Sequence, residues 1–186
     1  TCIDKFPGSL PEDALLHLDA IAGNVFAKYD TPKAAQALWK PRFLRAAAWF
    51  VARERERRAG IQHSLTEVES AEWAVTEHFA VHGVADRIDI LTNGGAAILD
   101  YKTGKPPAPK QIKAFLAPQL LLEAAMLEAG AFEPAGKRTA KELLYVWFSG
   151  GKTPGEIEPV DLALVDETVR RLRDFIRKLS DPAMPY

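Results

Sequence analysis

The chain of 186 residues is long enough for one ordinary domain with a sizeable core. Its 24 Lys and Arg against 25 Asp and Glu exclude a global basic charge, so any surface for a polyanion must be a local patch. Cys2 is the only cysteine, which excludes an intrachain disulfide and fits a reducing compartment. No apolar run approaches the ~20 residues needed to cross a membrane.

The first 60 residues have the periodicity of helices. Apolar residues recur at helical spacing over 11–29, and a short helix is expected after the break at 30–33. Pro41 is expected to begin a third helix that ends at Gly60. The charged residues at 53–58 alternate in sign, a pattern typical of a solvent-exposed helix face.

From residue 64 the pattern becomes that of a mixed α/β domain. The expected elements are strands at 64–75, 78–91 and 96–102, a helix at 118–130, a strand at 141–151 and a helix at 161–180. This order favours an α/β fold in which helices flank a central mixed sheet. We expect an N-terminal helical segment (1–62) that packs on a core (63–186), forming one compact domain. Because the chain starts at Thr1, we also expect that it was cut from a longer protein.

Asp100 and Lys102 lie two positions apart in the strand expected at 96–102. They therefore share one face of that strand, roughly 6.5–7 Å apart along the chain. Asp86, on the preceding strand, can face Asp100 or Lys102 only if the two strands pair residues whose sequence numbers add up to an even number. That parity requires a loop of odd length, such as the three residues 93–95, or a bulge.

Two carboxylates a few ångströms apart repel each other, and a divalent cation relieves the repulsion. Oxygen ligands suit Mg²⁺ or Mn²⁺, with open positions for water and a substrate phosphate. Lys102 could then position or deprotonate an attacking water, or stabilise charge that builds up on the phosphate. The residues fit metal-assisted hydrolysis of a phosphodiester. They fit equally well a salt bridge at the sheet rim, with Asp86, Arg87 and Asp89 in a polar hairpin.

Three strings around these residues resemble the PD-(D/E)XK nuclease superfamily. They are "GVADRID" at 83–89, "LDYKTG" at 99–104 and "PQLLLEAA" at 118–125. The chain is most similar to the RecB-like nuclease domain at the C-terminus of bacterial AddB helicase–nuclease subunits. The resemblance is strong over about residues 80–130 and extends more loosely to the "W-x-P-R-F" string at 39–43.

The resemblance implies a site, residue by residue. Asp86 and Asp100 would bind the catalytic metal, with the main-chain carbonyl of Tyr101 as a third ligand. Lys102 would be the catalytic lysine. Gln119 would be the motif glutamine that reaches back to the site from the following helix. Mg²⁺ is the implied cofactor, and Mn²⁺ is expected to substitute for it.

The chain departs from the family pattern in three respects. Glu123 stands where many RecB-like domains carry the tyrosine of Q-x-x-x-Y. The family also has a G-x-x-x-H helix whose histidine completes the site. No such string occurs here, and the pattern would place that histidine shortly before Thr1. The iron–sulfur cysteines of some AddB-type nucleases are missing, so no iron–sulfur cluster is expected.

The resemblance implies a restriction-endonuclease-like fold and a Mg²⁺-dependent deoxyribonuclease. Such a domain would cut one DNA strand, fed by an AddA-type helicase–nuclease subunit, in double-strand break repair and recombination in the bacterial cytoplasm. The alternative is a catalytically silent DNA-binding or scaffolding module that keeps the nuclease fold. Such a module has no need to keep Asp86, Asp100 and Lys102 intact, which favours the enzyme.

Further charged residues flank the candidate site. Lys105, Lys110 and Lys113 follow the motif and could grip the backbone of a single strand. Solvated loop lysines explain them equally well. Glu67 and Glu69 lie on a strand that could flank the site, and either could add a ligand, although an exposed sheet face is the simpler interpretation.

Overall fold

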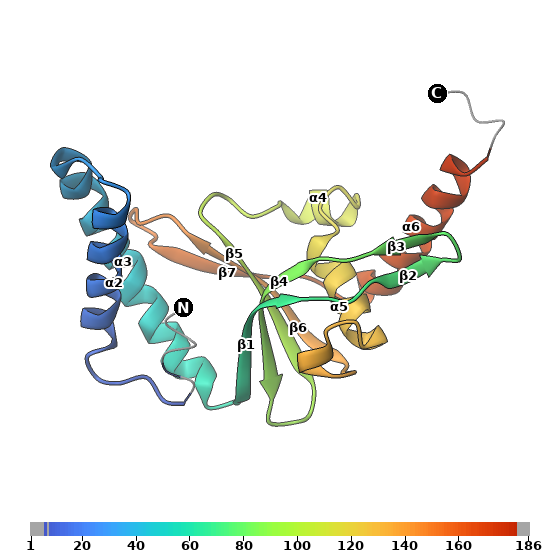
Figure 1. Ribbon diagram of the computed structural model, residues 1–186, viewed down its shortest axis with the longest axis horizontal. Helices are drawn as coiled ribbons and strands as arrows, with labels where there is room; N and C mark the ends of the chain where they lie inside the picture. The colour runs from blue at the N-terminus through green and yellow to red at the C-terminus, as the bar shows by residue number, and fades with distance from the viewer. Residues whose placement is uncertain (1–5, 7, 182–186) are drawn as a thin grey trace.

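The computed structural model describes residue 6 and residues 8–181, so Cys2 lies outside the described residues. The elements, in chain order, are α2 (Ala14–Lys28), α3 (Lys33–Arg58), β1 (Ile61–Glu69), β2 (Trp73–Thr76), β3 (Phe79–Val81), β4 (Val84–Leu91), β5 (Ala96–Lys102), α4 (Pro109–Lys113), α5 (Gln119–Ala129), the 3₁₀ turn η1 (Glu133–Ala135), β6 (Ala140–Phe148), β7 (Gly155–Pro159), the 3₁₀ turn η2 (Leu162–Leu164) and α6 (Val165–Leu179). The expected fold class is confirmed, because helices flank a five-stranded mixed sheet (Figure 1). Within the described chain, no helix combines the length and the apolar character that a membrane span requires.

The central sheet has the strand order β1-β4-β5-β6-β7. β4 and β5 form an antiparallel hairpin, whereas β6 runs parallel to β5. A parallel neighbour requires a long crossover, which here contains α4 and α5. The strand that carries the D-x-K string is therefore the central strand of the sheet. β2 and β3 form a separate hairpin that extends over α6 (Figure 1).

The hairpin of β4 and β5 has the parity that the candidate site requires. Ile88 pairs with Ile98, and Ile90 pairs with Ala96, so the paired residue numbers sum to an even number. The Leu91 N–H donates to the Gly95 carbonyl at 2.9 Å, which leaves residues 92–94 as a three-residue loop. The loop is one position earlier than the predicted 93–95, but its length, and hence the shared face, is as expected.

The sheet has a different core on each face. Even-numbered residues of β4 and β5, such as Ile88 and Ile98, belong to the larger apolar cluster, which includes the buried side chains of α5 and α6. Odd-numbered residues, such as Leu99, belong to a second cluster against which Trp49 of α3 packs. Figure 1 shows α2 and α3 on one side of the sheet and α5 and α6 on the other. Asp100 and Lys102 therefore lie on the α5 side.

The helix expected to begin at Pro41 does not begin there. Pro41 lies inside α3, which runs unbroken over 26 residues, so the prediction of two helices was wrong. An interior proline removes one helical hydrogen bond and commonly kinks the helix. On either side of Pro41 the helix contacts other elements: Lys40 forms a 2.9 Å ion pair with Asp19 of α2, and Arg45 donates to the Gly150 carbonyl at 2.6 Å.

Other boundaries also differ from the prediction. The long strands expected at 64–75 and 78–91 are each divided, where the Ser70 hydroxyl accepts a 3.0 Å hydrogen bond from the Gly83 N–H. The strand predicted at 141–151 is not the last, because β7 follows it. α4 and β7 are five residues each, too short for hydrophobic periodicity to indicate them.

The charged run of α3 is partly buried, contrary to the prediction of a solvent-exposed face. The side chain of Glu54 is 1% exposed and that of Arg87, on β4, is 0% exposed. Arg87 donates to both carboxylate oxygens of Glu54, at 2.8 and 3.0 Å, and to Asp89 at 2.6 Å. Arg58 and Arg57 add bonds to Glu54 and Asp89. The polar hairpin considered from the sequence is thus part of a buried ion network.

This network ties α3 to the strand that carries Asp86. Burial opposes the charged form of Glu54, but hydrogen bonds from Arg87 and Arg58 outweigh it, so the pKa of Glu54 lies below its ordinary value. A buried carboxylate that is paired this completely is stable only with its partners present. The contact joins the two predicted parts of the chain, whose boundary at 62/63 stays a prediction.

We expect Glu54→Ala to lower the free energy of unfolding by about 3–5 kcal/mol, because it leaves the Arg87 guanidinium buried without its main partner. Urea denaturation at pH 7 measures this. Glu56→Ala is the matched control, because Glu56 forms an exposed ion pair with Arg53 on the same helix and its loss should cost less than about 1 kcal/mol. Equal losses in the two variants would contradict a structural role for the network.

Candidate active site

Asp86 and Asp100 meet where β4 and β5 separate. The recorded pairs of the hairpin end at Arg87 and Leu99, one step before these two acids. Beyond that point the Asp86 carboxylate accepts a 2.8 Å hydrogen bond from the Tyr101 N–H, in place of a strand–strand bond. Asp100 is 1% exposed, and Asp86 is half-buried. The charge of Asp86 contributes to the raised pKa of Asp100, so the two carboxylates lie near each other at this strand end.

Lys102 and Gln119 contact Asp100 directly. The Lys102 ammonium lies 2.9 Å from Oδ1 and 2.7 Å from Oδ2 of Asp100. Gln119 is the first residue of α5, and its Nε2 donates to Asp100 Oδ1 at 2.7 Å. Its Oε1 accepts from Lys102 at 3.4 Å. The structure thus brings together Asp86, Asp100, Lys102 and Gln119, as the resemblance implies.

Glu123 is a third acid at this site, one turn along α5 from Gln119. Its Oε1 accepts a 3.0 Å hydrogen bond from Gln119 Nε2, and its buried Oε2 has no hydrogen-bond partner among the described residues. Burial raises the pKa of Glu123 to about 7, with the charges of Asp100 and Asp86 adding to the effect and the Gln119 bond opposing it. The sequence marked this position only as a departure from the tyrosine of the family pattern.

Negative charge exceeds positive charge around the site. Burial raises the pKa of Asp100 above its ordinary value, the Lys102 ion pair opposes this, and the Asp86 charge adds to it. One ammonium thus lies near three carboxyl groups: Asp100 and Glu123 belong to its hydrogen-bonded cluster, and Asp86 is bonded to the adjoining Tyr101 N–H. A bound cation would lower the free energy of the charged carboxylates, because it supplies the missing positive charge.

The available donors fit a hard divalent cation. Among the described residues, no three or more His, Cys, Asp or Glu side chains form a ready metal cage. Mg²⁺ does not need one, because it commonly keeps several waters and takes one or two carboxylates. The N–H and C=O of a strand residue point to the same edge, so the Tyr101 carbonyl lies on the side of the N–H that Asp86 accepts. Asp86, Asp100 and that carbonyl could hold the ion.

Glu67 lies beside Asp86 on β1. The register pairs Thr66 with Arg87 and Val68 with Ala85, which places Glu67 opposite Asp86. Its backbone has a φ of 50°, a left-handed conformation that is uncommon for a side chain of this size. The Glu67 side chain is exposed, as expected from the sequence, and lines a cavity together with Asp86.

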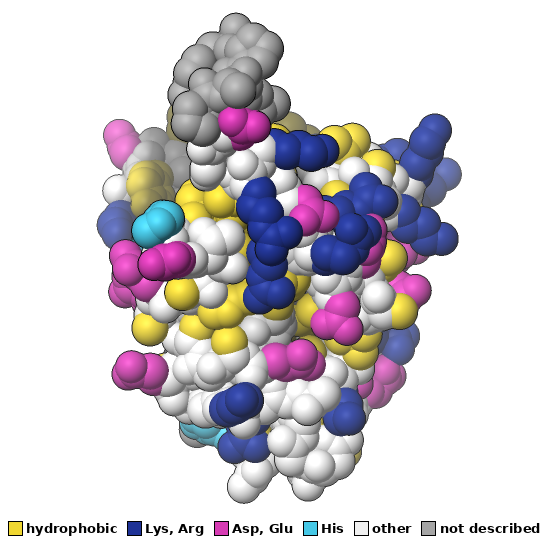
Figure 2. Space-filling model, turned by 90° about the vertical axis from the view of Figure 1, so that its right-hand side faces the viewer, with side chains coloured by type: hydrophobic (Ala, Val, Ile, Leu, Met, Phe, Trp, Pro, Cys, Tyr) yellow, Lys and Arg dark blue, Asp and Glu magenta, His cyan; other side chains and the backbone are white. Residues whose placement is uncertain are grey.

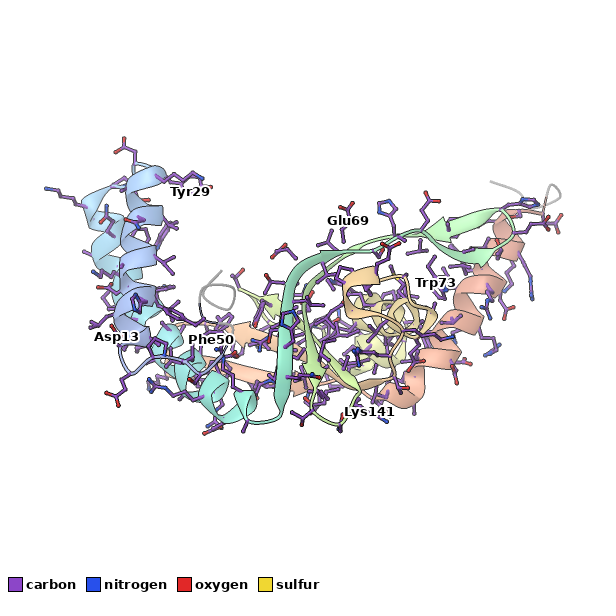
Figure 3. The ribbon with its side chains drawn as sticks, turned by 60° about the horizontal axis from the view of Figure 1, so that its bottom comes forward. Asp13, Tyr29, Phe50, Glu69, Trp73 and Lys141 are labelled. Carbon is purple, nitrogen blue, oxygen red and sulfur yellow. The ribbon has the colours of Figure 1, made fainter. Side chains whose placement is uncertain are left out.

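This cavity, about 390 Å³ in volume, opens between α3 and the sheet. Its walls are largely apolar and include Phe43, Phe50, Tyr101 and Phe148. Figure 3 shows Phe50 projecting from α3 toward the sheet, and its ring centroid lies 6.3 Å from that of Tyr101. Asp86 and Tyr101 are among the residues that line it, so this apolar cavity borders the candidate site.

The three lysines after the motif lie outside the hydrogen-bonded acid cluster. Lys105 follows β5 and lines a groove that also contains Glu156 and Glu158. Lys110 and Lys113 lie on α4 and are exposed. None of the three has a recorded contact with Asp86 or Asp100, so their part in binding a strand stays a prediction.

Comparison with known proteins identifies the family. A family model described as the PD-(D/E)XK nuclease superfamily matches residues 2–186. The chain belongs to the PD-(D/E)XK nuclease superfamily. Members of this superfamily are generally nucleases and typically use divalent metals, which agrees with the donors at Asp86 and Asp100. The match does not distinguish AddB-type domains from other members of the superfamily.

The relatives are much longer than the region that aligns with this chain. An uncharacterized protein of Rickettsia bellii is 30% identical over 123 residues, which are 65% of this chain and 14% of that protein. One from Rickettsia conorii is 43% identical over 58 residues, 31% of this chain and 7% of that protein. The crystal structure of SSO0001 aligns with 90% of this chain and 71% of its own, at 18% identity and a TM-score of 0.39, too distant a likeness to carry an argument.

We expect Mn²⁺ to raise the melting temperature of the EDTA-treated chain by about 3–5 °C when its concentration is ten times the dissociation constant. Asp86→Asn and Asp100→Asn should each abolish the shift, because each removes a charged ligand. Differential scanning fluorimetry measures the shift within each variant. Asp166→Asn, a change in the first turn of α6, should keep it. A shift of wild-type size in Asp86→Asn would contradict the assignment.

The raised pKa of Glu123 predicts a pH-dependent loss of stability. The folded chain holds this proton up to about pH 7, whereas the unfolded chain loses it near 4.5, so stability falls as the pH rises through this window. Glu123→Gln should therefore gain up to about 3 kcal/mol on the wild type between pH 4.5 and pH 8 in EDTA. Urea denaturation measures this, with the exposed Glu77→Gln as control. A constant difference across the window would contradict it.

Proposed function

We propose that this chain is the Mg²⁺-dependent nuclease domain of an AddB-type helicase–nuclease subunit and hydrolyses phosphodiesters of DNA. The observation that carries the proposal is the hydrogen-bonded cluster of Asp100, Lys102 and Gln119, with Asp86 at the adjoining strand end. A salt bridge at the sheet rim would not require a buried Asp100 or a glutamine that bonds both partners. Membership of the PD-(D/E)XK superfamily supports the reaction class.

In this mechanism the two aspartates and the Tyr101 carbonyl hold Mg²⁺. The ion, when bound, supplies activation of water and neutralises charge on the phosphate. Lys102, one third exposed at its side chain, can reach solvent and hold the attacking water by a hydrogen bond. Gln119 keeps Lys102 and Asp100 in place, because its amide bonds both of them.

The biological setting is also part of the proposal. The Rickettsia relatives are far longer than the matched region, which fits a domain within a long polypeptide. The similarity of the 83–89, 99–104 and 118–125 strings to AddB proteins supports an AddA-type partner that delivers single-stranded DNA. Double-strand break repair and recombination in the bacterial cytoplasm is the process that this pairing would serve. Lys105, Lys110 and Lys113 are proposed contacts to the strand backbone.

Cleavage of an end-labelled single-stranded oligonucleotide, with Mg²⁺ or Mn²⁺, tests the mechanism. We expect Lys102→Ala to slow cleavage by about 10²–10⁴-fold, because it removes the group that holds the attacking water. Lys141→Ala is the matched control, because Lys141 is an exposed lysine at the opposite end of the sheet (Figure 3). Equal rates in the wild type and Lys102→Ala would contradict the mechanism, and DNA binding without cleavage would favour the silent module.

A further inference from the structure

The apolar cavity between α3 and the sheet has no part in the mechanism proposed above. Its volume of about 390 Å³ falls within the range of pockets that hold small organic ligands. Phe43, Phe50, Tyr101 and Phe148 line it, and each of the four is only half-buried. A closed core would cover these rings, so a cavity between four partly exposed aromatic side chains indicates a binding surface.

Three of the rings hold one another in place. The centroids of Tyr101 and Phe148 lie 5.9 Å apart, and their planes differ by 22°. The ring of Phe50 meets both at steeper angles, at 6.3 Å from Tyr101 and 6.0 Å from Phe148. The Tyr101 hydroxyl also accepts a 3.1 Å hydrogen bond from Arg87 of the buried ion network. A wall fixed in this way is ready to stack on a flat ligand, because binding does not have to order it.

Two residues belong both to the cavity and to the proposed metal site. Asp86 lines the cavity, and its carboxylate accepts the 2.8 Å hydrogen bond from the Tyr101 N–H. Tyr101 supplies a ring to the cavity wall and, through its main chain, the carbonyl proposed as a metal ligand. A molecule held at the metal site therefore adjoins the cavity. In a nucleic acid one sugar joins each phosphate to its base, so the two parts can occupy adjoining positions.

The charges of the cavity favour a base over a phosphate. Among the described residues that line it, none is Lys, Arg or His, whereas Asp86 and Glu67 are acids. Carboxylates repel a phosphate, and an apolar wall gives it no hydrogen bonds in return for its lost water. A nucleobase carries no charge at neutral pH, and its flat face stacks on aromatic side chains. The base is thus the part of a nucleotide that fits this cavity.

We propose that the cavity binds one base of the DNA strand whose phosphate lies at the Asp86–Asp100 site, by stacking on its aromatic wall. The proposal rests on the proposed nuclease function and names the form of DNA that the site accepts. A base that is paired and stacked in a duplex cannot enter without being extruded, so the cavity selects single-stranded over double-stranded DNA. Because every base has a face that stacks, the contact imposes little sequence preference.

Removal of single bases from the substrate tests the proposal. The 186-residue chain is given end-labelled single strands in Mn²⁺, each with one abasic nucleotide, and a sequencing gel shows which phosphates are cut. We expect one phosphate, at a fixed offset from the abasic nucleotide, to be cut about tenfold more slowly, the effect of one lost stacking contact. Phe50→Leu should slow cutting of the intact strand by a similar factor and remove the slow position, because both changes delete the same contact.

Crosslinking provides a second measurement that needs neither cleavage nor a variant of the cavity. Strands with 5-iodouracil in place of thymine are irradiated with the Lys102→Ala chain, and the crosslinked residues are mapped by mass spectrometry. We expect crosslinks to the aromatic residues of the cavity. Crosslinks to other parts of the chain alone would overturn the proposal, including the case in which Phe50→Leu does not fold.

Phe175→Leu is the matched control, because Phe175 is 58% exposed on α6 and should leave both the rate and the slow position unchanged. Figure 2 looks onto the side of the molecule that carries α6 and shows Lys and Arg side chains gathered there, so the control also tests an exposed phenylalanine near cations. Cutting without any slow position, or a slow position that persists in Phe50→Leu, would overturn the base cavity and leave the nuclease function standing. If the wild type neither binds nor cuts the strand, both proposals are overturned.

Discussion

The length of the loop at 92–94 is the constraint on which both faces of the sheet depend. With three residues in the loop, Asp100 shares the α5 face with the apolar Ile88 and Ile98 and contacts Gln119 there. One residue more or fewer would turn β5 over relative to β4, because side chains alternate with a period of two. Asp100 would then lie on the face of Arg87, away from Gln119. The position of every candidate residue on β5 follows from this single register.

The two charged clusters on opposite faces of the sheet differ in how their carboxyl groups are paired with cations. Under α3, the Arg87 guanidinium donates to both Glu54 and Asp89, so each carboxylate has an arginine partner. On the α5 face, Glu123 has an unpaired oxygen and Asp100 has a raised pKa. The α3 cluster also has an unpaired atom, Arg57 Nε, and a perturbed acid, Glu54, but the pKa of that acid is lowered by its arginine partners. Carboxyl groups with raised pKa values beside a single lysine are instead typical of a functional site. Burial alone does not distinguish the clusters, since both are buried.

Much of the fold and of the candidate site could be predicted because the signals are local. Strand alternation puts Asp100 and Lys102 on one face, the predicted three-residue turn at 93–95 has the correct length although it lies one residue too late, and the family strings point to Gln119. The burial of Glu54 could not be predicted, because its helix pattern is that of a solvated face and its partner is 33 residues away. The raised pKa of Glu123 likewise could not be predicted, because it depends on how deeply α5 is buried. Pro41 misled the helix prediction because a proline signals a helix start only locally, whereas α3 continues through it and contacts distant residues on both sides.

The central claim is that Asp86 and Asp100 act together on one cation. Anomalous diffraction from crystals soaked in Mn²⁺ tests this directly, because it locates the ion independently of activity. The account predicts one strong peak within about 2.0–2.6 Å of an oxygen of each aspartate, the range of metal–oxygen bonds. A peak held by only one of them, or carboxylates that remain apart with no peak at saturating Mn²⁺, would contradict it.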